Sequence, residues 1–230
     1  MNIAFFGSSL LSAYWNGAAT YYRGILRALE ARGHRITFYE PDAFDRQAHR
    51  DIDPPPWAKV VVYENSEDAA LEQVEAARRA DLIVKASGVG VFDRLLETAV
   101  LAGKRPGAMA VFWDVDAPAT LERIARDEHD PFRELIPRYD LILTYGGGPP
   151  VVEEYRSLGA QDCVPIYNAL DPATHFPAPP DPRFQADLAF LGNRLPDRET
   201  RVEEFFFQAA EQEKDARFLL GGNGWQDKAL

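Results

Sequence analysis

The sequence predicts an α/β fold in which a parallel β-sheet is covered by α-helices on both faces. Short apolar runs alternate with helical patterns along almost all of the 230 residues. This alternation is typical of parallel sheets, because parallel strands are joined by crossover connections that are usually helices. Most of the runs are continuously apolar, which indicates strands that are buried on both faces of the sheet.

Seven predicted strands occupy the sequence up to residue 167. They are Ile3–Phe6, Arg35–Tyr39, Val60–Tyr63, Leu82–Val84, Ala110–Trp113, Leu141–Leu143 and Val164–Tyr167. Apolar residues recur at helical spacing between them, which predicts a helix in each interval that carries such a stripe. The clearest stripes are Tyr22–Leu29, Leu71–Ala77, Phe92–Ala99, Leu121–Ile124 and Val151–Tyr155. Glycines at positions 33, 103 and 159 end three of these helices, and Pro118 suits a first turn.

The composition changes after Asp171, where five prolines in the segment up to Arg183 indicate a stiff, extended linker. The α/β pattern then restarts with a strand at Leu188–Leu191, a helical stripe at Val202–Ala209 and a strand at Phe218–Leu220. We therefore predict a first Rossmann-like domain at residues 1–171, a linker at 172–183, and the start of a second Rossmann-like domain at 184–230.

The second domain is expected to be incomplete in this sequence. A single β-α-β unit offers few partners for three consecutive phenylalanines, Phe205, Phe206 and Phe207. A domain of this class needs roughly 150 residues. The prediction is that these side chains pack on the first domain or on another chain, or stay mobile.

Charge and cysteine content exclude several classes of function. The net charge of −11 argues against a general affinity for the phosphates of nucleic acid, so no nucleic-acid partner is predicted. The lone cysteine, Cys163, excludes an internal disulfide and a Cys-rich metal site, and it indicates a reducing compartment such as the cytoplasm. No apolar run approaches the roughly 20 residues of a membrane span.

Two segments resemble known glycosyltransferases. Tyr167–Pro172, with His175-Phe176-Pro177 after it, resembles the hinge signature of many GT-B glycosyltransferases, although Ala169 replaces the usual glycine. Trp113–Pro118 and Tyr145–Pro149 resemble the glycosyltransferases related to the spore maturation protein CgeB. In that family the second domain opens with a strand, a Leu-Gly turn and an Asp-Arg helix start. The corresponding residues here are Phe190–Asn193 and Asp197-Arg198.

Asp114 and Asp116 are the predicted catalytic residues. They follow an apolar strand and are expected at the carboxyl edge of the sheet, where open α/β sheets bind ligands. A carboxylate there could take the proton from an acceptor hydroxyl in an inverting transfer. Two carboxylates two residues apart in an extended segment are expected to point the same way. The alternative is that Asp116 caps the helix that begins at Pro118.

The loops after other strands supply the predicted binding residues. The expected substrate-binding residues are Gly7, Ser8, Ser9, Asn16, Gly17, Thr20, Gly146, Gly147, Gly148 and Asn168. The expected binding residues for a donor diphosphate are Gly192, Asn193 and Arg198. Several of these have a structural alternative: a strand-to-helix turn for Gly7–Ser9, a helix cap for Thr20, a flexible loop for the three consecutive glycines and a surface helix residue for Arg198. His34 and His49 are interpreted as surface residues.

The resemblance implies transfer of a sugar from a nucleotide-sugar to an acceptor hydroxyl in a cleft between two domains. The 230 residues alone are expected to have little or no transfer activity, because most of the nucleotide-binding residues are expected to follow Leu230. The nucleotide-sugar is a co-substrate, and no tightly bound cofactor and no metal are expected. The acceptor is left open among a glycan, a small molecule and a protein, and homo-oligomerisation is also left open. Two alternatives remain: a non-catalytic Rossmann-like binding module, and another GT-B enzyme such as a nucleotide-sugar epimerase.

Overall fold

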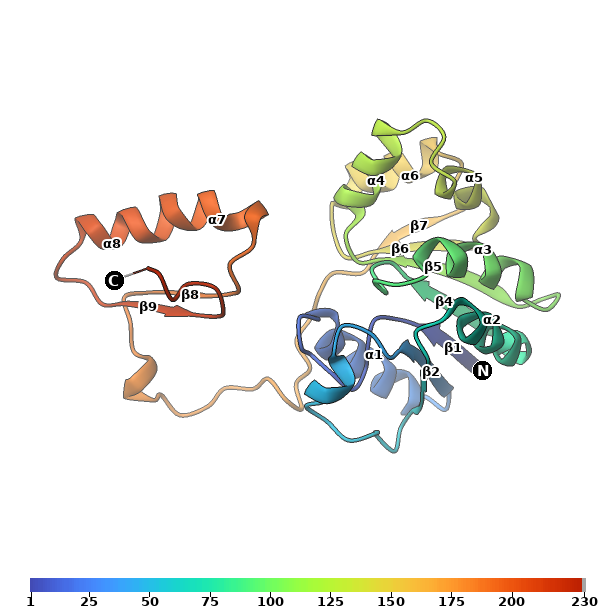
Figure 1. Ribbon diagram of the computed structural model, residues 1–230, viewed down its shortest axis with the longest axis horizontal. Coiled ribbons are helices and arrows are strands. Elements are labelled where there is room, and N and C mark those ends of the chain that lie inside the picture. Colours follow the sequence, from blue (N-terminus) through green and yellow to red (C-terminus); the bar gives the residue numbers. More distant parts are fainter. Residues whose placement is uncertain (229–230) are drawn as a thin grey trace. The chain divides into compact units, whose positions relative to one another are not determined.

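The computed structural model describes residues 1–228, and within it the chain divides into two compact units (Figure 1). The first unit is Met1–His175, and the second begins at Phe176. The described part of the chain contains no helix that is long and apolar enough to cross a membrane.

The first unit is built on a seven-stranded sheet with the order β3-β2-β1-β4-β5-β6-β7, in which all neighbouring strands are parallel. Its strands are β1 (Asn2–Phe6), β2 (Arg35–Pro41), β3 (Lys59–Tyr63), β4 (Leu82–Ala86), β5 (Met109–Asp114), β6 (Leu141–Thr144) and β7 (Cys163–Pro165). Each predicted strand overlaps one of these. The predicted fold class, a Rossmann-like parallel sheet surrounded by helices, is therefore confirmed.

Helices cover the two faces of this sheet unequally. The helices are α1 (Ala18–Glu30), α2 (Glu67–Ala76), α3 (Asp93–Gly103), α4 (Ala117–Arg126), α5 (Phe132–Leu135) and α6 (Gly148–Ser157). Alternate residues of β1 face opposite sides: Ala4 and Phe6 join the core beneath α2 to α6, whereas Ile3 and Phe5 join the core beneath α1. One face therefore carries five helices, and α1 is the single helix on the other (Figure 1).

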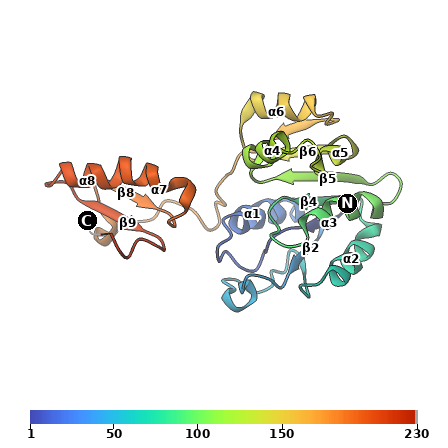
Figure 2. The same ribbon diagram turned by 45° about the horizontal axis from the view of Figure 1, so that its top comes forward.

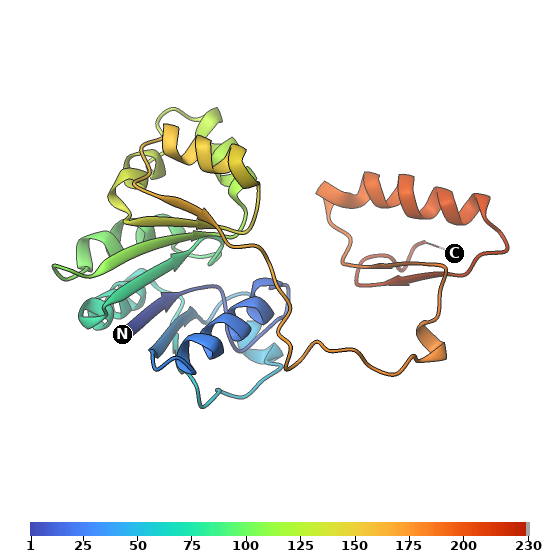
Figure 3. The ribbon, with the colours of Figure 1, turned by 180° about the vertical axis from the view of Figure 1, so that it is seen from behind.

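The segment after β7 lies along α1 (Figure 3). The hydroxyl of Tyr21 donates to the backbone oxygens of Ile166 and Tyr167, at 3.4 Å each. Further along, Arg27 of α1 pairs with the buried carboxylate of Asp171. These contacts keep the chain with the first unit as far as His175, whose backbone N–H donates to the carbonyl of Asp171 at 2.7 Å.

The second unit is a small β-α-β arrangement. Its parallel strands β8 (Leu188–Leu191) and β9 (Phe218–Gly221) are covered on one side by a continuous helix (Figure 2). That helix consists of α7 (Pro196–Val202), a π-helical turn (Glu203–Phe207) and α8 (Gln208–Gln212).

The prediction that this unit cannot bury its phenylalanines is wrong for two of the three. Phe206 and Phe207 are buried in a cluster with Val202 and Trp225, whereas Phe205 is 68% exposed. The indole of Trp225 supplies the partner that the strand–helix pattern did not reveal, because it lies beyond the last predicted strand.

Candidate functional site

The carboxyl edge of the first sheet is where the fold can place a ligand. The chain runs outward from β1 through β2 to β3, and then returns to the other side of β1 to form β4. The connections after β1 and β4 therefore leave in opposite directions, which opens a crevice at the carboxyl ends of these two strands. The predicted catalytic and substrate-binding residues of the first unit belong to loops at this edge, to the start of α1 or to the segment after β7.

The polar residues of the loop after β1 point into the protein. Ser8, Ser9 and Asn16 are all buried. The hydroxyl of Ser8 donates to Asn16 Oδ1 at 2.8 Å, and Asn16 Nδ2 donates to the backbone oxygens of Ser9 and Ser12 at 3.0 Å. Gly7 has no room for a side chain, since a Cβ there would approach the Phe38 ring at 2.6 Å. These residues shape the loop from within.

Glu40 at the end of β2 anchors the same loop and was missed by the sequence analysis. Its side chain is fully buried. It accepts hydrogen bonds from the hydroxyl of Ser9 at 3.0 Å, from the backbone N–H of Leu10 at 2.5 Å and from Gln47 Nε2 at 2.7 Å. A buried carboxylate is stable only when such donors replace water, so Glu40 and the loop after β1 form one polar unit.

Arg46 joins the loops on the two sides of the crevice. Its Nη1 donates to the carbonyl of Ser8 after β1 at 3.2 Å and to the carbonyl of Val89 after β4 at 3.3 Å. Burial lowers the pKa of this guanidinium, while the charge of Glu40 opposes that shift. Sequence reasoning missed Arg46, because nothing in the residues around it distinguishes it from a surface arginine.

Backbone strain is concentrated around these loops. Four non-glycine residues have a left-handed backbone: Trp15 (φ 48°), Phe44 (φ 57°), Asp45 (φ 59°) and Phe92 (φ 56°). Each costs on the order of 1–3 kcal/mol and persists only where surrounding contacts impose it, as happens at functional sites. The Phe44 ring lies so close to Gly90 that a Cβ on this glycine would approach it at 2.6 Å, which ties the strained segment to the loop after β4.

The two predicted catalytic aspartates differ in their surroundings. Asp114 is 0% exposed. Its Oδ1 accepts from the hydroxyls of Ser87 and Thr120 and from the backbone N–H of Asp116, at 2.9, 3.0 and 3.1 Å. Its Oδ2 accepts from the hydroxyl of Tyr155 at 2.5 Å. Four donors leave the Asp114 carboxylate little capacity to take a proton from a substrate.

Asp116 is exposed, so the expectation that both carboxylates point the same way is wrong. The backbone turns between them: Asp114 ends β5, whereas Asp116 takes the N-cap position of α4. Its side chain makes no capping hydrogen bond, so the alternative that it acts as a side-chain cap is not supported. Of the pair, Asp116 is the carboxylate that a substrate could reach.

The glycine loop after β6 shapes the start of α6. Gly147 is the N-cap residue with φ 83°, and a Cβ there would approach Val151 Cγ2 at 2.0 Å. Glycine is therefore required at this position for structural reasons. At Gly146 a Cβ would meet nothing within 4 Å, so this residue borders open space.

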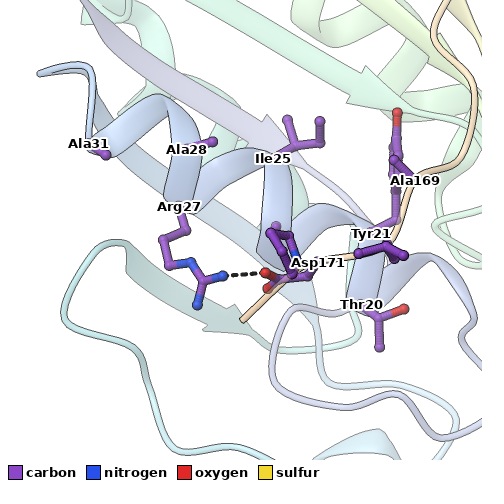
Figure 4. A pocket seen from close by; sticks show the side chains of 11 residues that line it. Thr20, Tyr21, Ile25, Arg27, Ala28, Ala31, Ala169 and Asp171 are labelled. Atoms are coloured by element: carbon purple, nitrogen blue, oxygen red, sulfur yellow. Dashed lines mark hydrogen bonds and ion pairs between the residues drawn. The ribbon is translucent and has the colours of Figure 1, made fainter. Parts of the chain in front are cut away.

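The start of α1 and the hinge segment border a cavity of about 460 Å³ (Figure 4). Gly17 is the N-cap residue of α1, and the exposed Thr20 donates to its carbonyl at 3.3 Å. Thr20 also lines the cavity, together with Tyr21, Ala169 and the Arg27–Asp171 pair. Asn168 is exposed just before this stretch.

The predicted donor-binding residues lie at the carboxyl end of β8. The carbonyl of Gly192 accepts from the indole N–H of Trp225 at 2.8 Å, and Asn193 Oδ1 accepts from the backbone N–H of Asn223 at 2.9 Å. The guanidinium of Arg198 lies beside Gly192, with Nη1 3.5 Å from a Cβ built on that glycine. These three residues are therefore neighbours within the second unit.

No group of three or more His, Cys, Asp or Glu side chains suited to a metal ion occurs among the described residues. A site for a metal held by the protein alone is thus not identified in residues 1–228.

The fold has counterparts among solved structures. An α-glucosyltransferase in complex with UDP-glucose and DNA containing an abasic site matches 96% of this chain with a TM-score of 0.58 and 15% sequence identity. The chain shares the fold of this glucosyltransferase. It spans 57% of the length of that structure. A second structure, an α-glucosyltransferase with UDP and a 13-mer DNA containing a central A:G mismatch, matches with 13% identity, a TM-score of 0.49 and coverage of 96% and 65%. No protein-family model and no curated protein sequence matches the chain.

The prediction that nucleic acid is not a partner is contradicted by this comparison. The glucosyltransferase that shares the fold was solved with DNA. The net charge of −11 is a sum over the whole chain, and a local surface can still bind phosphates. Overall charge is therefore no ground for excluding DNA.

Proposed function

We propose that this chain takes part in transferring a hexose from a nucleotide-sugar to an acceptor hydroxyl, as a GT-B-type glycosyltransferase of the CgeB-like kind. The observation that supports this most is its similarity in fold, over 96% of its residues, to a glucosyltransferase solved with UDP-glucose. The hinge-like segment from Tyr167 to Pro177 and the crevice at the carboxyl ends of β1 and β4 agree with it.

In this proposal the two predicted domains divide the substrates. The first, residues 1–171, binds the acceptor at its carboxyl edge. The second uses Gly192, Asn193 and Arg198 to contact the diphosphate of the donor, since a guanidinium matches the geometry of phosphate oxygens. UDP-glucose is the donor to test first.

The chemistry assigned to the site is a single displacement. The acceptor oxygen forms a bond to C1 of the sugar while the bond from C1 to the diphosphate oxygen breaks, and the nucleoside diphosphate leaves with the electron pair. The proton of the acceptor hydroxyl moves to a base, and Asp116 is the candidate because its carboxylate is exposed. Asp114 is assigned a positioning role, because it accepts a hydrogen bond from the backbone N–H of Asp116.

Product analysis with UDP-glucose tests the proposal against its alternatives. Incubation of the full-length protein with labelled UDP-glucose and a panel of glycan, small-molecule and oligonucleotide acceptors should release UDP and label an acceptor. Conversion of UDP-glucose into an epimer would indicate an epimerase instead. Binding of UDP-glucose without turnover on any acceptor would favour a non-catalytic binding module.

Matched variants test the roles of the two aspartates. Asp116→Asn should lower the transfer rate by about 10²–10⁴-fold, with the affinity for donor nearly unchanged. Asp114→Asn should chiefly lower the melting temperature, because it disturbs the four hydrogen bonds that the buried Asp114 carboxylate accepts. Wild-type turnover by Asp116→Asn would remove this residue from the mechanism.

A further inference from the structure

Exposed aromatic rings gather beside the strained loops at the carboxyl ends of β1 and β2. The rings of Tyr14 and His49 are stacked, with centroids 4.0 Å apart and planes 10° from parallel. The indole of Trp15 meets the Tyr14 ring edge-on at 6.4 Å. Tyr14 is 39% exposed and Trp15 is 53% exposed. We call Tyr14, Trp15 and His49 the aromatic platform.

The platform is held in place by bonds between the two loops that carry it. The hydroxyl of Ser12 donates to the carbonyl of His49 at 2.7 Å, and the backbone N–H of Ala13 donates to Asp51 Oδ1 at 2.9 Å. Asp51 is itself held by Arg23 of α1 through two hydrogen bonds of 2.8 Å. These contacts impose the left-handed backbone of Trp15 and fix the rings before any ligand arrives.

The His49 ring presents a hydrogen-bond acceptor. Its Nδ1 lies 2.9 Å from the carbonyl oxygen of Asp45. A carbonyl can only accept, so Nδ1 carries the proton, and in the neutral ring the lone pair is on Nε2. The carboxylate of Asp45 also lies near Nδ1, at 3.3 Å, and both it and Asp51 are substantially exposed.

We propose that the aromatic platform binds a pyranose ring of a glycan acceptor, with the C–H face of the sugar on the exposed rings and a hydroxyl donated to His49 Nε2. This inference rests on the proposed function and names the acceptor class for it. The electron-rich face of an aromatic ring attracts the C–H groups of a sugar. His49 Nε2 and the exposed carboxylate of Asp45 beside the rings are acceptors, and sugar hydroxyls can donate to them.

The chemistry of the surroundings favours a sugar over an apolar peptide segment. An apolar peptide would cover the rings but would desolvate the exposed carboxylate of Asp45 without supplying a donor. A pyranose combines one apolar face with a rim of hydroxyls. The platform offers the matching arrangement of rings bordered by acceptors.

The test is a binding experiment that needs no donor. Maltotetraose, cellotetraose and chitotetraose are titrated into the protein, and the His49 ring signals are followed by NMR. At least one oligosaccharide should shift these signals. Trp15→Ala and Tyr14→Ala should each weaken its binding about tenfold or more, as expected for an aromatic anchor. Phe184→Ala is the matched control, because Phe184 is also exposed but belongs to the other unit, and it should bind like wild type.

Thermal melts of each variant separate loss of binding from loss of folding. If Trp15→Ala does not fold, Trp15→Tyr with His49→Gln keeps the question testable, since Tyr retains a ring and Gln retains an acceptor. Retention of binding by Trp15→Tyr would support the platform. Equal binding by Trp15→Ala and wild type would overturn the proposal.

Three further outcomes discriminate between ligands and between the two proposals. A single-stranded oligothymidylate that shifts the His49 signals in a Trp15-dependent way, where the oligosaccharides do not, would overturn the glycan assignment. Oligosaccharide binding without turnover of any nucleotide-sugar would support the platform and count against the transfer reaction. Transfer to a glycan with an unchanged KM in Trp15→Ala would overturn the platform and leave the transfer intact.

Discussion

The two compact units differ in how deeply they bury their charged side chains. The first unit buries Glu40, Lys85, Glu97 and Asp114 and satisfies them through hydrogen bonds or ion pairs within the sheet and its loops. In the second unit the half-buried Arg194 forms ion pairs with two more exposed carboxylates, those of Glu199 and Asp227. Buried charges fix loop geometry, whereas exposed pairs are screened by water. Substitutions of these charged residues should therefore lower the free energy of unfolding strongly in the first unit and weakly in the second.

The largest effect is expected for Glu40→Ala. At least three donors lose their acceptor, each at about 1–3 kcal/mol, so the free energy of unfolding should fall by at least about 3 kcal/mol. Urea denaturation measures this. Glu64→Ala is the control, since Glu64 is exposed at the end of β3 and should change little. Equal losses of stability for the two substitutions would show that the buried carboxylate contributes no more than an exposed one.

Two buried tyrosines of the first unit allow a hydrogen bond to a charged group to be compared with one to a neutral group. Tyr155 and Tyr139 are both fully buried, and the former donates to the carboxylate of Asp114 whereas the latter donates to the carbonyl of Glu97. Tyr155→Phe should cost about 1.5–3 kcal/mol and Tyr139→Phe about 0.5–1.5 kcal/mol, because a bond to a charged group contributes more. Urea denaturation of the two variants compares these losses. A larger loss for Tyr139→Phe than for Tyr155→Phe would contradict a stronger bond to the charged group.

Glu97 should give the first unit a pH-dependent stability. Burial raises the pKa of this carboxyl, and the neighbouring Lys85 partly opposes the shift. The other charged groups that influence it are Asp93, Arg123 and Asp130. Because the folded-state pKa lies above the unfolded value, the contribution of Glu97 is fully present below its ordinary pKa and is lost as the pH rises through the raised one.

Replacing Glu97 by Gln should remove this dependence. The stability of Glu97→Gln relative to wild type should therefore increase as the pH rises from about 4.3, the ordinary pKa of a glutamate. Melting temperatures across this range provide the measurement, with the exposed Glu134→Gln as the control. A difference between wild type and variant that does not change with pH would show that Lys85 fully compensates the burial.

The smallest effect is expected for Glu199→Ala in the second unit. Arg194 keeps its contact with Asp227 at 2.8 Å and its position over the Trp225 ring when Glu199 is removed. The melting curve of Glu199→Ala should overlay that of wild type, and added salt should leave both curves unchanged. A marked loss of stability would mean that this exposed pair carries more of the second unit than its solvation suggests.

The strands were predictable because continuous apolar runs have few interpretations when turn residues bound them. Helix α5 was not predicted, because four residues at Phe132–Leu135 are too few to show a periodic stripe. In the site, sequence located the correct edge for Ser8, Ser9 and Asp114 and could not tell that they face inward. Ser9 and Asp114 have partners far along the chain, at Glu40 and Tyr155, and only the folded structure brings them together.

The aromatic platform was not predicted either, because its residues are also far apart in the sequence. Tyr14 and His49 are separated by a helix and a strand, and each by itself looks like an isolated surface residue. A sequence signal did exist in the adjacent aromatic pair Tyr14-Trp15, which lies in the loop after β1. Two large aromatic residues in a loop at this edge are a reason to expect a binding surface.

The bonds around Asp171 also identify a natural junction for recombining modules. Its side chain pairs with Arg27 and accepts from the backbone N–H of Ala173, and its carbonyl accepts from the N–H groups of Thr174 and His175. A Cβ at Gly24 would lie 3.3 Å from that of Asp171, so α1 is fitted closely to this segment. A chimaera that exchanges the second unit should thus be joined after His175, because a junction before Asp171 would leave Arg27 of α1 without its partner.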